Sequence, residues 1–420
     1  MDKNLPLLNA KTAEERLENA KKIAKETVFP KSEFDDVNGH IHTTYSFSPY
    51  SPTASVYMAK MSGLRTAGIM DHDSVSGAKE FLSAGEIFGL PLTVGMECRV
   101  SVKGTAFETK KINNPDQVGC AYITVHGLPH DQIDKLNAIY APYRAYRNER
   151  NIAMVERINE LFGKYDIKLD FEGDVLPLSE YATGGTVTER HISSALAGKL
   201  IDVFGKGEKL ISFITDTLKL SPSKKVMGYL ADPQNEHYLY DLIGVIKSDI
   251  IGAFYIPADK ELMHITDFAD IMNSLDAVPC IPYLGDIAGE SVTGDKKAQV
   301  FEDAFLDEWV EYCKSIGFKG ITFAPSRNTL PQIERLRGLV RKFGLMEISG
   351  EDINTSRQSF VCTKMREDDF ETLRHSAYAI IAHERRATYN KADSFFGANT
   401  AREFPDWENR LISFADMIRK

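Results

Sequence analysis

Residues 37–48, VNGHIHTTYSFS, place two histidines two positions apart in a short segment typical of a β-strand. Side chains alternate between the two faces of a strand, so His40 and His42 point one way and Ile41 points the other. Two imidazoles on one face suit a divalent metal ion, because neutral imidazole nitrogen is a common ligand for zinc and related ions. The same spacing also fits two polar residues at the mouth of a strand that bond only to water.

The composition is that of an acidic globular chain. Its 420 residues are enough for one large α/β domain or two ordinary ones. The hydrophobic fraction of 43% and the charged fraction of 26% are both close to globular averages. A net charge of −10 disfavours binding to a nucleic-acid backbone, so we expect no nucleic-acid partner. An anionic substrate stays compatible with this charge if metal ions supply local positive charge.

Cysteine usage and the lack of long apolar segments predict the compartment. The cysteines are scattered without any C-x-x-C pair, which indicates buried thiols in a reducing environment (Cys98, Cys120, Cys280, Cys313 and Cys362). The N-terminal segment is polar and helix-like, and no run of about 18 apolar residues occurs. We therefore expect a cytoplasmic protein without a membrane span. The oligomeric state does not follow from the sequence.

Seven short apolar runs are candidate strands. They are DVNGHIH, RTAGIMDHD, LPLTVGMECRV, GCAYITVHG, DAVPCIPYLGD, FKGITFAPSRN and GLMEISGEDIN. Helical patterns lie between most of them, as in residues 74–88 and 330–343. Alternating strands and helices predict a parallel sheet with crossover helices. Seven such units favour a barrel-like closure over an open sheet.

Potential metal ligands recur near the ends of these strands. In (β/α) barrels the working residues lie at the carboxyl ends of the strands. Such positions are occupied here by His42, His72, Glu97, His126 and Asp352. Their recurrence on successive strands favours the metal interpretation of the two histidines in HIH.

Residues 127–277 separate the fourth candidate strand from the fifth and are rich in helical patterns. Residues 143–165 are amphipathic, and residues 188–206 begin with Thr188 as a candidate N-cap. We expect a mostly helical insertion over the barrel mouth, placed to close the site and select the substrate. The barrel would then comprise residues 1–126 and 278–420.

Taken in order, the runs HIHTTYS…SP, IMDHDSVSG, GMECRV, HGL and SGEDIN resemble the motifs of the PHP (polymerase and histidinol phosphatase) family. TERHISSAL in the helical segment is similar to that family's TRPHxAxAL motif. The resemblance covers about residues 37–355. It implies an α/β fold with a distorted seven-stranded (β/α) barrel, two or three divalent metal ions and hydrolysis of phosphoesters.

The resemblance also implies roles by position. His40, His42, Glu97 and Asp352 would hold a first metal ion. Glu97 would bridge to a second ion that also takes His126, and His72 would belong to a third. Glu97 and Asp352 are therefore the candidate catalytic residues.

Three usual ligand positions of the family carry other residues, namely Phe47, Tyr283 and Asn354. A phenylalanine cannot bind a metal ion, and an asparagine oxygen is a weak, hard ligand better suited to magnesium or manganese than to zinc. Asp286 stands near Tyr283 as a substitute ligand. We therefore expect one or two divalent ions, drawn from zinc, manganese, iron and magnesium.

Several further polar residues are candidates for binding the substrate. Arg190, at the start of a predicted helix, is suited to hold a phosphate by bidentate hydrogen bonds, and the helix terminus adds positive potential. Arg327 and Asn354 are the other candidate substrate contacts. Asp73 is a candidate to orient a ligand histidine. The evenly spaced Arg144, Arg147 and Arg150 are expected to form a solvated helix face.

The leading hypothesis is a metal-dependent phosphoesterase that hydrolyses a small phosphorylated molecule with metal-activated water. One alternative is a catalytically degraded PHP scaffold with a ligand-binding or regulatory role. Another is hydrolysis of a non-phosphate bond, such as an amide or lactone, by the same chemistry. A nuclease or proofreading role is disfavoured by the acidic charge.

Overall fold

The computed structural model describes residues 2–287 and 298–419. All seven candidate strands form, and they build one curled sheet in the order β1-β2-β3-β4-β6-β7-β8, with the short β5 paired to β3. The strands are β1 (Val37–Ile41), β2 (Thr66–His72), β3 (Leu92–Ser101), β4 (Cys120–His126), β5 (Met263–His264), β6 (Val278–Pro282), β7 (Gly320–Thr322) and β8 (Met346–Ile348).

The expected all-parallel sheet is wrong at β4, which runs antiparallel to both β3 and β6. Residues 102–119, between β3 and β4, contain no helix, so the chain turns back directly instead of crossing over. A parallel return needs a long crossover connection, which this segment does not provide. As a consequence, His126 at the end of β4 pairs with Val278 at the start of β6 and not with a residue at the end of that strand.

The two edges of the curled sheet meet only partly. An isolated parallel bridge joins Ile41 to Ile353, beyond the end of β8. The amide of His42 donates to the carbonyl of Ile353 over 3.0 Å, and the amide of Ile353 donates to the carbonyl of His40 over 3.1 Å. The predicted barrel is therefore only partly formed: it is a curled seven-stranded sheet whose edges are joined by one bridge among the described residues and are not fully closed.

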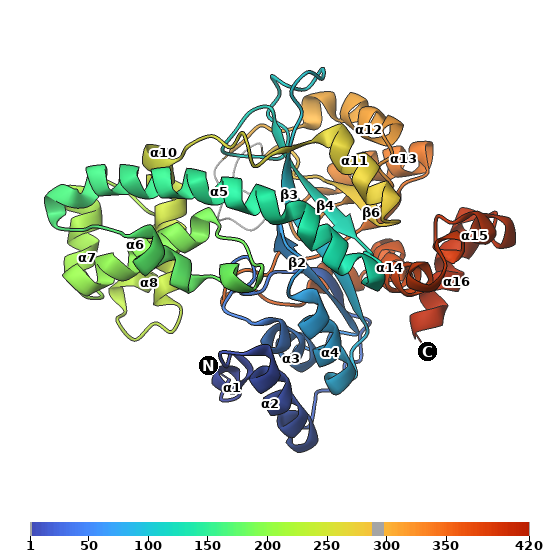
Figure 1. Ribbon diagram of the computed structural model, residues 1–420, viewed down its shortest axis with the longest axis horizontal. Coiled ribbons are helices and arrows are strands. Elements are labelled where there is room, and N and C mark those ends of the chain that lie inside the picture. Colours follow the sequence, from blue (N-terminus) through green and yellow to red (C-terminus); the bar gives the residue numbers. More distant parts are fainter. Residues whose placement is uncertain (1, 288–297, 420) are drawn as a thin grey trace.

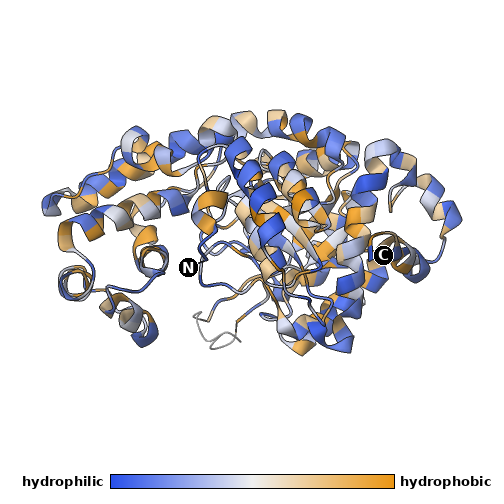
Figure 2. Ribbon diagram, turned by 90° about the horizontal axis from the view of Figure 1, so that it is seen from below, coloured by the Kyte–Doolittle hydropathy of each residue, from blue (hydrophilic) through white to orange (hydrophobic). Residues whose placement is uncertain are grey.

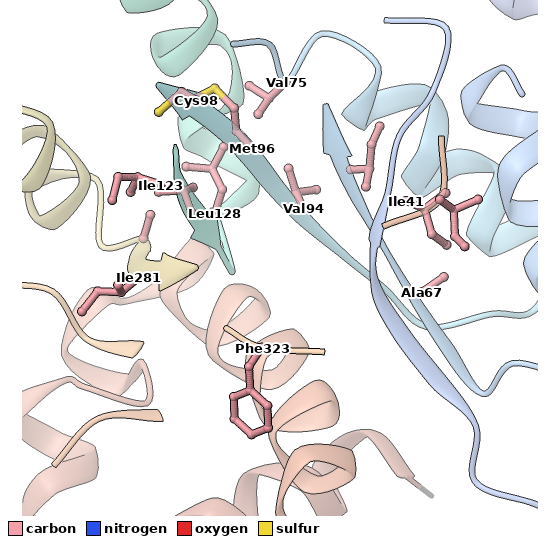
Figure 3. Close-up of a cluster of buried hydrophobic side chains, with 14 of the residues drawn as sticks. Ile41, Ala67, Val75, Val94, Met96, Cys98, Ile123, Leu128, Ile281 and Phe323 are labelled. Carbon is pink, nitrogen blue, oxygen red and sulfur yellow. The ribbon is translucent and has the colours of Figure 1, made fainter. Parts of the chain in front are cut away.

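The outer face of the sheet carries the main hydrophobic core. Val94, Met96 and Cys98 of β3 are buried in it, and Ile41 of β1 lies in the same core (Figure 3). By alternation, Glu97 and the two histidines that flank Ile41 face the inside of the curl. Helices cover the outer face, and they are α3 (Pro52–Met61), α4 (Ala78–Phe88), α11 (Ile265–Ser274), α12 (Leu306–Ser315) and α13 (Leu330–Phe343).

A group of helices between β4 and β5 forms a second core, which we call the helical cluster. Its buried residues run from Met154 to Phe254 and also include Phe47 from the loop after β1. The 30-residue helix α5 extends from the sheet into this cluster (Figure 1). The helices of the helical cluster are α5 (Ile133–Phe162), α6 (Glu189–Phe204), α7 (Glu208–Ser212), α8 (Lys224–Ala231), α9 (Tyr238–Val245) and α10 (Ile251–Phe254).

Part of segment 127–277 belongs to the sheet region instead. Met263 of β5 pairs with Val100 of β3, and Phe268 of α11 lies in the main core. The first turns of α5 pack there as well, through Ile133 and Tyr140. The segment thus leaves the sheet along α5 and returns to it at β5.

The helices at the two ends of the chain complete the packing. At the start, α1 (Leu5–Leu8) and α2 (Ala13–Glu26) pack on α3 and α4. At the end are α14 (Glu371–Tyr389), α15 (Ala398–Glu403) and α16 (Trp407–Arg419). Helix α14 contacts β1, β3 and β8 and shares a third core with Val278 and Cys280 of β6.

The helices carry both hydrophilic and hydrophobic residues along their length (Figure 2). Within residues 2–287 and 298–419, none has the length and apolar character needed to cross a bilayer.

Candidate metal centre

Glu97 lies at the middle of the candidate ligands. Its Oε2 atom is 3.8 Å from Nε2 of His40, 3.7 Å from Nε2 of His42 and 3.3 Å from Nδ1 of His72. The strands produce this convergence, because His72 at the end of β2 pairs in register with Glu97 of β3, and His40 and His42 stand at the end of the adjacent β1. One carboxylate oxygen within reach of three imidazoles is compatible with the bridging role that the sequence predicted for Glu97.

Asp352 joins the group from the loop after β8. Its Oδ1 atom is 3.2 Å from Nε2 of His42, and the Nε2 atoms of His40 and His42 are 3.3 Å apart. The donor atoms therefore fall into two sets, each within 4.8 Å, that share His42: one with His40 and Asp352, the other with His72 and Glu97. The two histidines of β1, His72 and Glu97 meet because β1, β2 and β3 are neighbours in the sheet, and Asp352 reaches them because the curl brings the end of β8 back to β1.

Metal binding requires deprotonated ligands, and the pKa shifts of His72 and Asp352 favour that state. The pKa of His40 is shifted the other way: burial opposes its protonation, but the hydrogen bond and charge of Glu97 raise the pKa. Burial, helped by repulsion from His42, holds the pKa of His72 well below its usual value, so that imidazole is neutral. The side chain of Asp352 is 55% exposed, so desolvation opposes its ionisation only weakly, and the hydrogen bond and charge of His42 hold the pKa of Asp352 well below its usual value.

His126 approaches the site from deeper in the curl. It lines a cavity of about 380 Å³ together with His40, Glu97 and Asp352, although it is not part of either donor set. Burial lowers the pKa of His126 to about 3, and His40 adds to the effect. Its Nε2 atom is buried and has no hydrogen-bond partner among the described residues. Because buried polar atoms are normally paired, this orphaned nitrogen fits a ligand to a metal ion.

Asp71, which was not among the residues predicted from the sequence, is linked to His42 through the hydroxyl of Ser46. It accepts hydrogen bonds from the amide and hydroxyl of Thr43, at 2.7 and 2.6 Å, and from the hydroxyl of Ser46 at 2.6 Å. Ser46 Oγ in turn lies 3.1 Å from Nδ1 of His42. Such a carboxylate-linked support fixes the ring that ligates a metal. The signal was the first aspartate of DHD, one residue before His72.

The predicted solvated face of α5 is wrong, because Arg144, Arg147 and Arg150 are all buried. Arg147 binds Asp73 over 2.5 Å and Glu189 over 2.6 Å. Arg150 binds the second oxygen of Glu189, also over 2.6 Å. The carboxylates come from the end of β2 and the start of α6, which the i, i+3, i+6 spacing on one helix could not reveal.

The same network reaches the sheet. Arg99 of β3 lies 3.1 Å from Glu189 and 3.7 Å from Glu261, and Arg150 also pairs with Glu261. Asp73, predicted to orient a ligand histidine, instead pairs with Arg147 of α5. The buried ion pairs therefore fix the first turn of α6 against the sheet.

That first turn presents Arg190. Thr188 caps α6 in a capping box with His191, as the sequence predicted for the N-cap. Arg190 donates to Oδ1 of Asn354 over 2.5 Å, and Nδ2 of Asn354 donates to Oδ1 of Asp352 over 2.6 Å. Asn354 thus connects the arginine to a candidate metal ligand. It orients both groups and is not itself within either donor set.

A second, smaller cavity of about 200 Å³ lies on the Arg190 side of the centre. Its lining includes His72, Glu97 and Asp352, together with Arg190 and Lys247. Lys247 comes from the π-helical turn Ile246–Ile250 that follows α9. Nothing in the local sequence IKSDI signals a site, so sequence reasoning missed this residue.

The positions that depart from the family pattern have structural partners. Phe47 packs edge-on against His191, with ring centroids 5.0 Å apart, and so belongs to the helical cluster. The hydroxyl of Tyr283 donates to Asp303 over 2.5 Å. Asp286 accepts from the amide of Phe301 over 2.6 Å and is absent from both donor sets found among the described residues.

Arg327 lines the larger cavity, and its Nε donates to the carbonyl of Leu284 over 3.0 Å. Histidines without ligand spacing bind other groups. His130 pairs with Glu384, His237 bonds to Ser356, and the buried His383 bonds to the backbone of Asp276 and Phe395.

Comparison with known proteins supports the fold at low sequence identity. No family model matches the chain, and no significant match is found among curated proteins. A solved structure from Bifidobacterium adolescentis, for which metal-dependent phosphoesterase activity has been suggested, aligns over 81% of this chain and 95% of its own, with a TM-score of 0.53 and 18% identity. An amidohydrolase from Chromobacterium violaceum, solved with bound sulfate and no metal, aligns over 78% and 90%, with a TM-score of 0.52 and 15% identity. These likenesses show a shared fold.

Proposed function

We propose that this protein is a metal-dependent hydrolase, and specifically a phosphoesterase acting on a small phosphorylated molecule. One observation carries the proposal: six nitrogen and oxygen donors gather inside the curl of the sheet, beside a cavity lined by Arg190. The two structural neighbours, one suggested to be a phosphoesterase and one named an amidohydrolase, support the same broad chemistry.

The donors fit one or two divalent ions. His40, His42, Glu97 and Asp352 would hold one ion, and Glu97 would share a second with His126. His72, 3.3 Å from the same oxygen of Glu97, adds a further donor beside His42. Mixed imidazole and carboxylate ligands suit zinc, iron and manganese better than calcium. Such ions, when bound, polarise a phosphoryl oxygen and lower the pKa of water.

The chain's own residues would position the substrate. Arg190 presents its guanidinium to the smaller cavity, where it can donate to phosphoryl oxygens. Asn354 holds the arginine in place and ties it to Asp352. The buried pairs of Glu189 with Arg147 and Arg150 keep the turn that carries Arg190 rigid.

The test is a turnover panel on the purified protein, loaded in turn with Mn, Zn, Fe or Mg. Phosphomonoesters, phosphodiesters, amides and lactones are assayed side by side, with metal content measured on the same samples. We expect hydrolysis of a phosphoester above background with at least one ion, and loss of that rate on chelation. A rate confined to amides or lactones would replace the phosphoesterase proposal. Ligand binding without any turnover would favour the degraded-scaffold alternative.

A further inference from the structure

Lys247 is the one lysine among the residues that line the smaller cavity. It is carried by the helical cluster, on the π-helical turn Ile246–Ile250 between α9 and α10. Single π-helical turns within helices often occur at functional sites, because the extra residue redirects the side chains that follow it. This turn places an ammonium group in the same cavity wall as Arg190, Asp352 and Glu97.

Two cations, Arg190 and Lys247, line this cavity beside the carboxylates of Glu97 and Asp352, and neither cation forms an ion pair with a residue that the structure describes. Lys247 makes no ion pair or hydrogen bond with any residue that the structure describes, and only part of its side chain is exposed. Repulsion from Arg190 is the main cause that lowers the pKa of Lys247 to about 8, and burial acts in the same direction. Asp116, Glu189 and Asp352 offset this only in part. An anion placed between the two cations would relieve their repulsion.

The site has two cavities of different size, which would take different parts of a substrate. The cavity with Arg190 and Lys247 is about 200 Å³ and is bounded by Asn113, Pro115 and Tyr122. The larger cavity, about 380 Å³, adjoins the smaller one, because Glu97, Pro282, Leu284 and Asp352 line both. A terminal phosphoryl group fits the smaller space, and the rest of the molecule can extend into the larger one. A phosphodiester would need room for a second organic group beside the two cations.

Resting on the phosphoesterase proposal, we infer that Lys247 and Arg190 together form a subsite for the phosphoryl group that selects dianionic phosphomonoesters over monoanionic phosphodiesters. A phosphomonoester carries nearly two negative charges at neutral pH, because its second pKa is about 6. A diester carries only one. Two cations in one wall match the dianion, and loss of either should cost the monoester more than the diester.

The experiment replaces Lys247 by glutamine, which keeps the length of the side chain and removes its charge. The kcat/KM for p-nitrophenyl phosphate should fall at least about tenfold, as expected for losing a hydrogen bond to a charged group. The value for bis-p-nitrophenyl phosphate should change less than about threefold. Lys247→Arg should retain most of the monoester rate. Lys225→Gln, at an exposed lysine of α8 in the same cluster, is the matched control and should leave both values unchanged.

Titration calorimetry with inorganic phosphate separates this inference from the proposed function. Lys247→Gln should raise the Kd of phosphate at least about tenfold at unchanged metal content and melting temperature. If the wild type hydrolyses no phosphoester but Lys247→Gln still binds phosphate more weakly than the wild type does, the subsite stands and the phosphoesterase proposal fails. If the wild type hydrolyses monoesters and Lys247→Gln changes neither the selectivity nor the phosphate Kd, the inference is overturned. Wild-type preference for the diester overturns it as well.

Discussion

At the scale of single residues, Glu97 is the donor on which the centre depends most. Its Oε2 atom is within 3.8 Å of three histidine nitrogens, and its side chain lines both cavities. An amide at this position keeps the shape but removes the negative charge that would hold two cations together. The surrounding histidines would remain, so partial metal binding is expected to survive.

Glu97→Gln should therefore reduce the metal content and cut hydrolysis at least about a hundredfold, in line with the several kcal/mol that metal Lewis acidity supplies. Elemental analysis and turnover on the same preparation provide the measurement. Glu86→Gln, at an exposed position of α4, should behave like the wild type. Wild-type turnover by Glu97→Gln would contradict the role of this carboxylate.

His126 offers a test that distinguishes a ligand from a packing residue. Its Nε2 atom is buried without a partner among the described residues, so an apolar replacement removes an unpaired polar group. If His126 only packs, His126→Leu should be neutral or slightly stabilising and leave metal content unchanged. We expect instead that the variant loses about one metal equivalent per chain while the site at His40 and His42 keeps its ion. Titration of the apoprotein with zinc, followed by calorimetry, measures the number of equivalents.

At the scale of elements, the buried arginines of α5 hold the start of α6 against the sheet. Arg147→Met would leave Asp73 and Glu189 with fewer partners in a buried setting, although Arg150 and Arg99 still contact Glu189. Breaking a buried pair from one side typically costs about 3–5 kcal/mol. We expect a loss of unfolding free energy of this order in urea titrations. Arg157→Met, on an exposed part of the same helix, should cost less than about 1 kcal/mol.

The connection between β6 and α12 contains a carboxyl group that should make stability depend on pH. Glu302 accepts from the amides of Leu284 and Gly285, at 2.7 and 3.3 Å, and burial raises its pKa from 4.5 to about 8. Between these values the folded state keeps a proton that the unfolded state has lost. The contribution of Glu302 to the free energy of unfolding should therefore fall as pH rises from 4.5 to 8, by roughly 1.4 kcal/mol per pH unit at most.

Glu302→Gln mimics the neutral acid and should remove this part of the pH dependence. Relative to the wild type, the variant should gain stability at pH 8 and gain little near pH 4.5. Urea denaturation at both pH values gives the comparison, with Glu308→Gln on exposed α12 surface as the control. Equal slopes of stability against pH in Glu302→Gln and wild type would rule out this residue as the source.

Elements governed by local pattern could be predicted from the sequence, and those set by distant partners could not. Helix α13 spans the residues 330–343 that its apolar spacing indicated, and Thr188 caps α6 as its position before the helix suggested. The predicted parallel direction of β4 was wrong. Its direction depends on the lack of a helix in residues 102–119, and the pattern of residues within a strand does not report on that connection. The carboxylate partners of Arg147 could not be predicted because only the folded chain brings Asp73 and Glu189 to it. Lys247 could not be predicted because only the folded chain places it in the cavity that Arg190 lines.

At the scale of the whole molecule, bound metal should act as a cross-link that completes the barrel. The candidate ligands come from β1, β2, β3, β4 and the loop after β8, and they span the gap that the single bridge between Ile41 and Ile353 closes. Ions bound only to the folded state stabilise it by mass action, by about 2.7 kcal/mol at a free concentration of a hundred times Kd. Chelation should therefore lower the melting temperature, and readdition of the ion should restore it.

Hydrogen exchange on the metal-loaded and chelated protein locates this effect. The amides of His42 and Ile353, which form the closing hydrogen bonds, should exchange faster after chelation, because the ligands beside them no longer hold the two edges together. Amides of α16, which packs on α14 away from the ligands, serve as the internal reference and should be unchanged. Equal protection at His42 and Ile353 with and without metal would show that the bridge closes the sheet without an ion, and the cross-link would then have no part in holding the barrel.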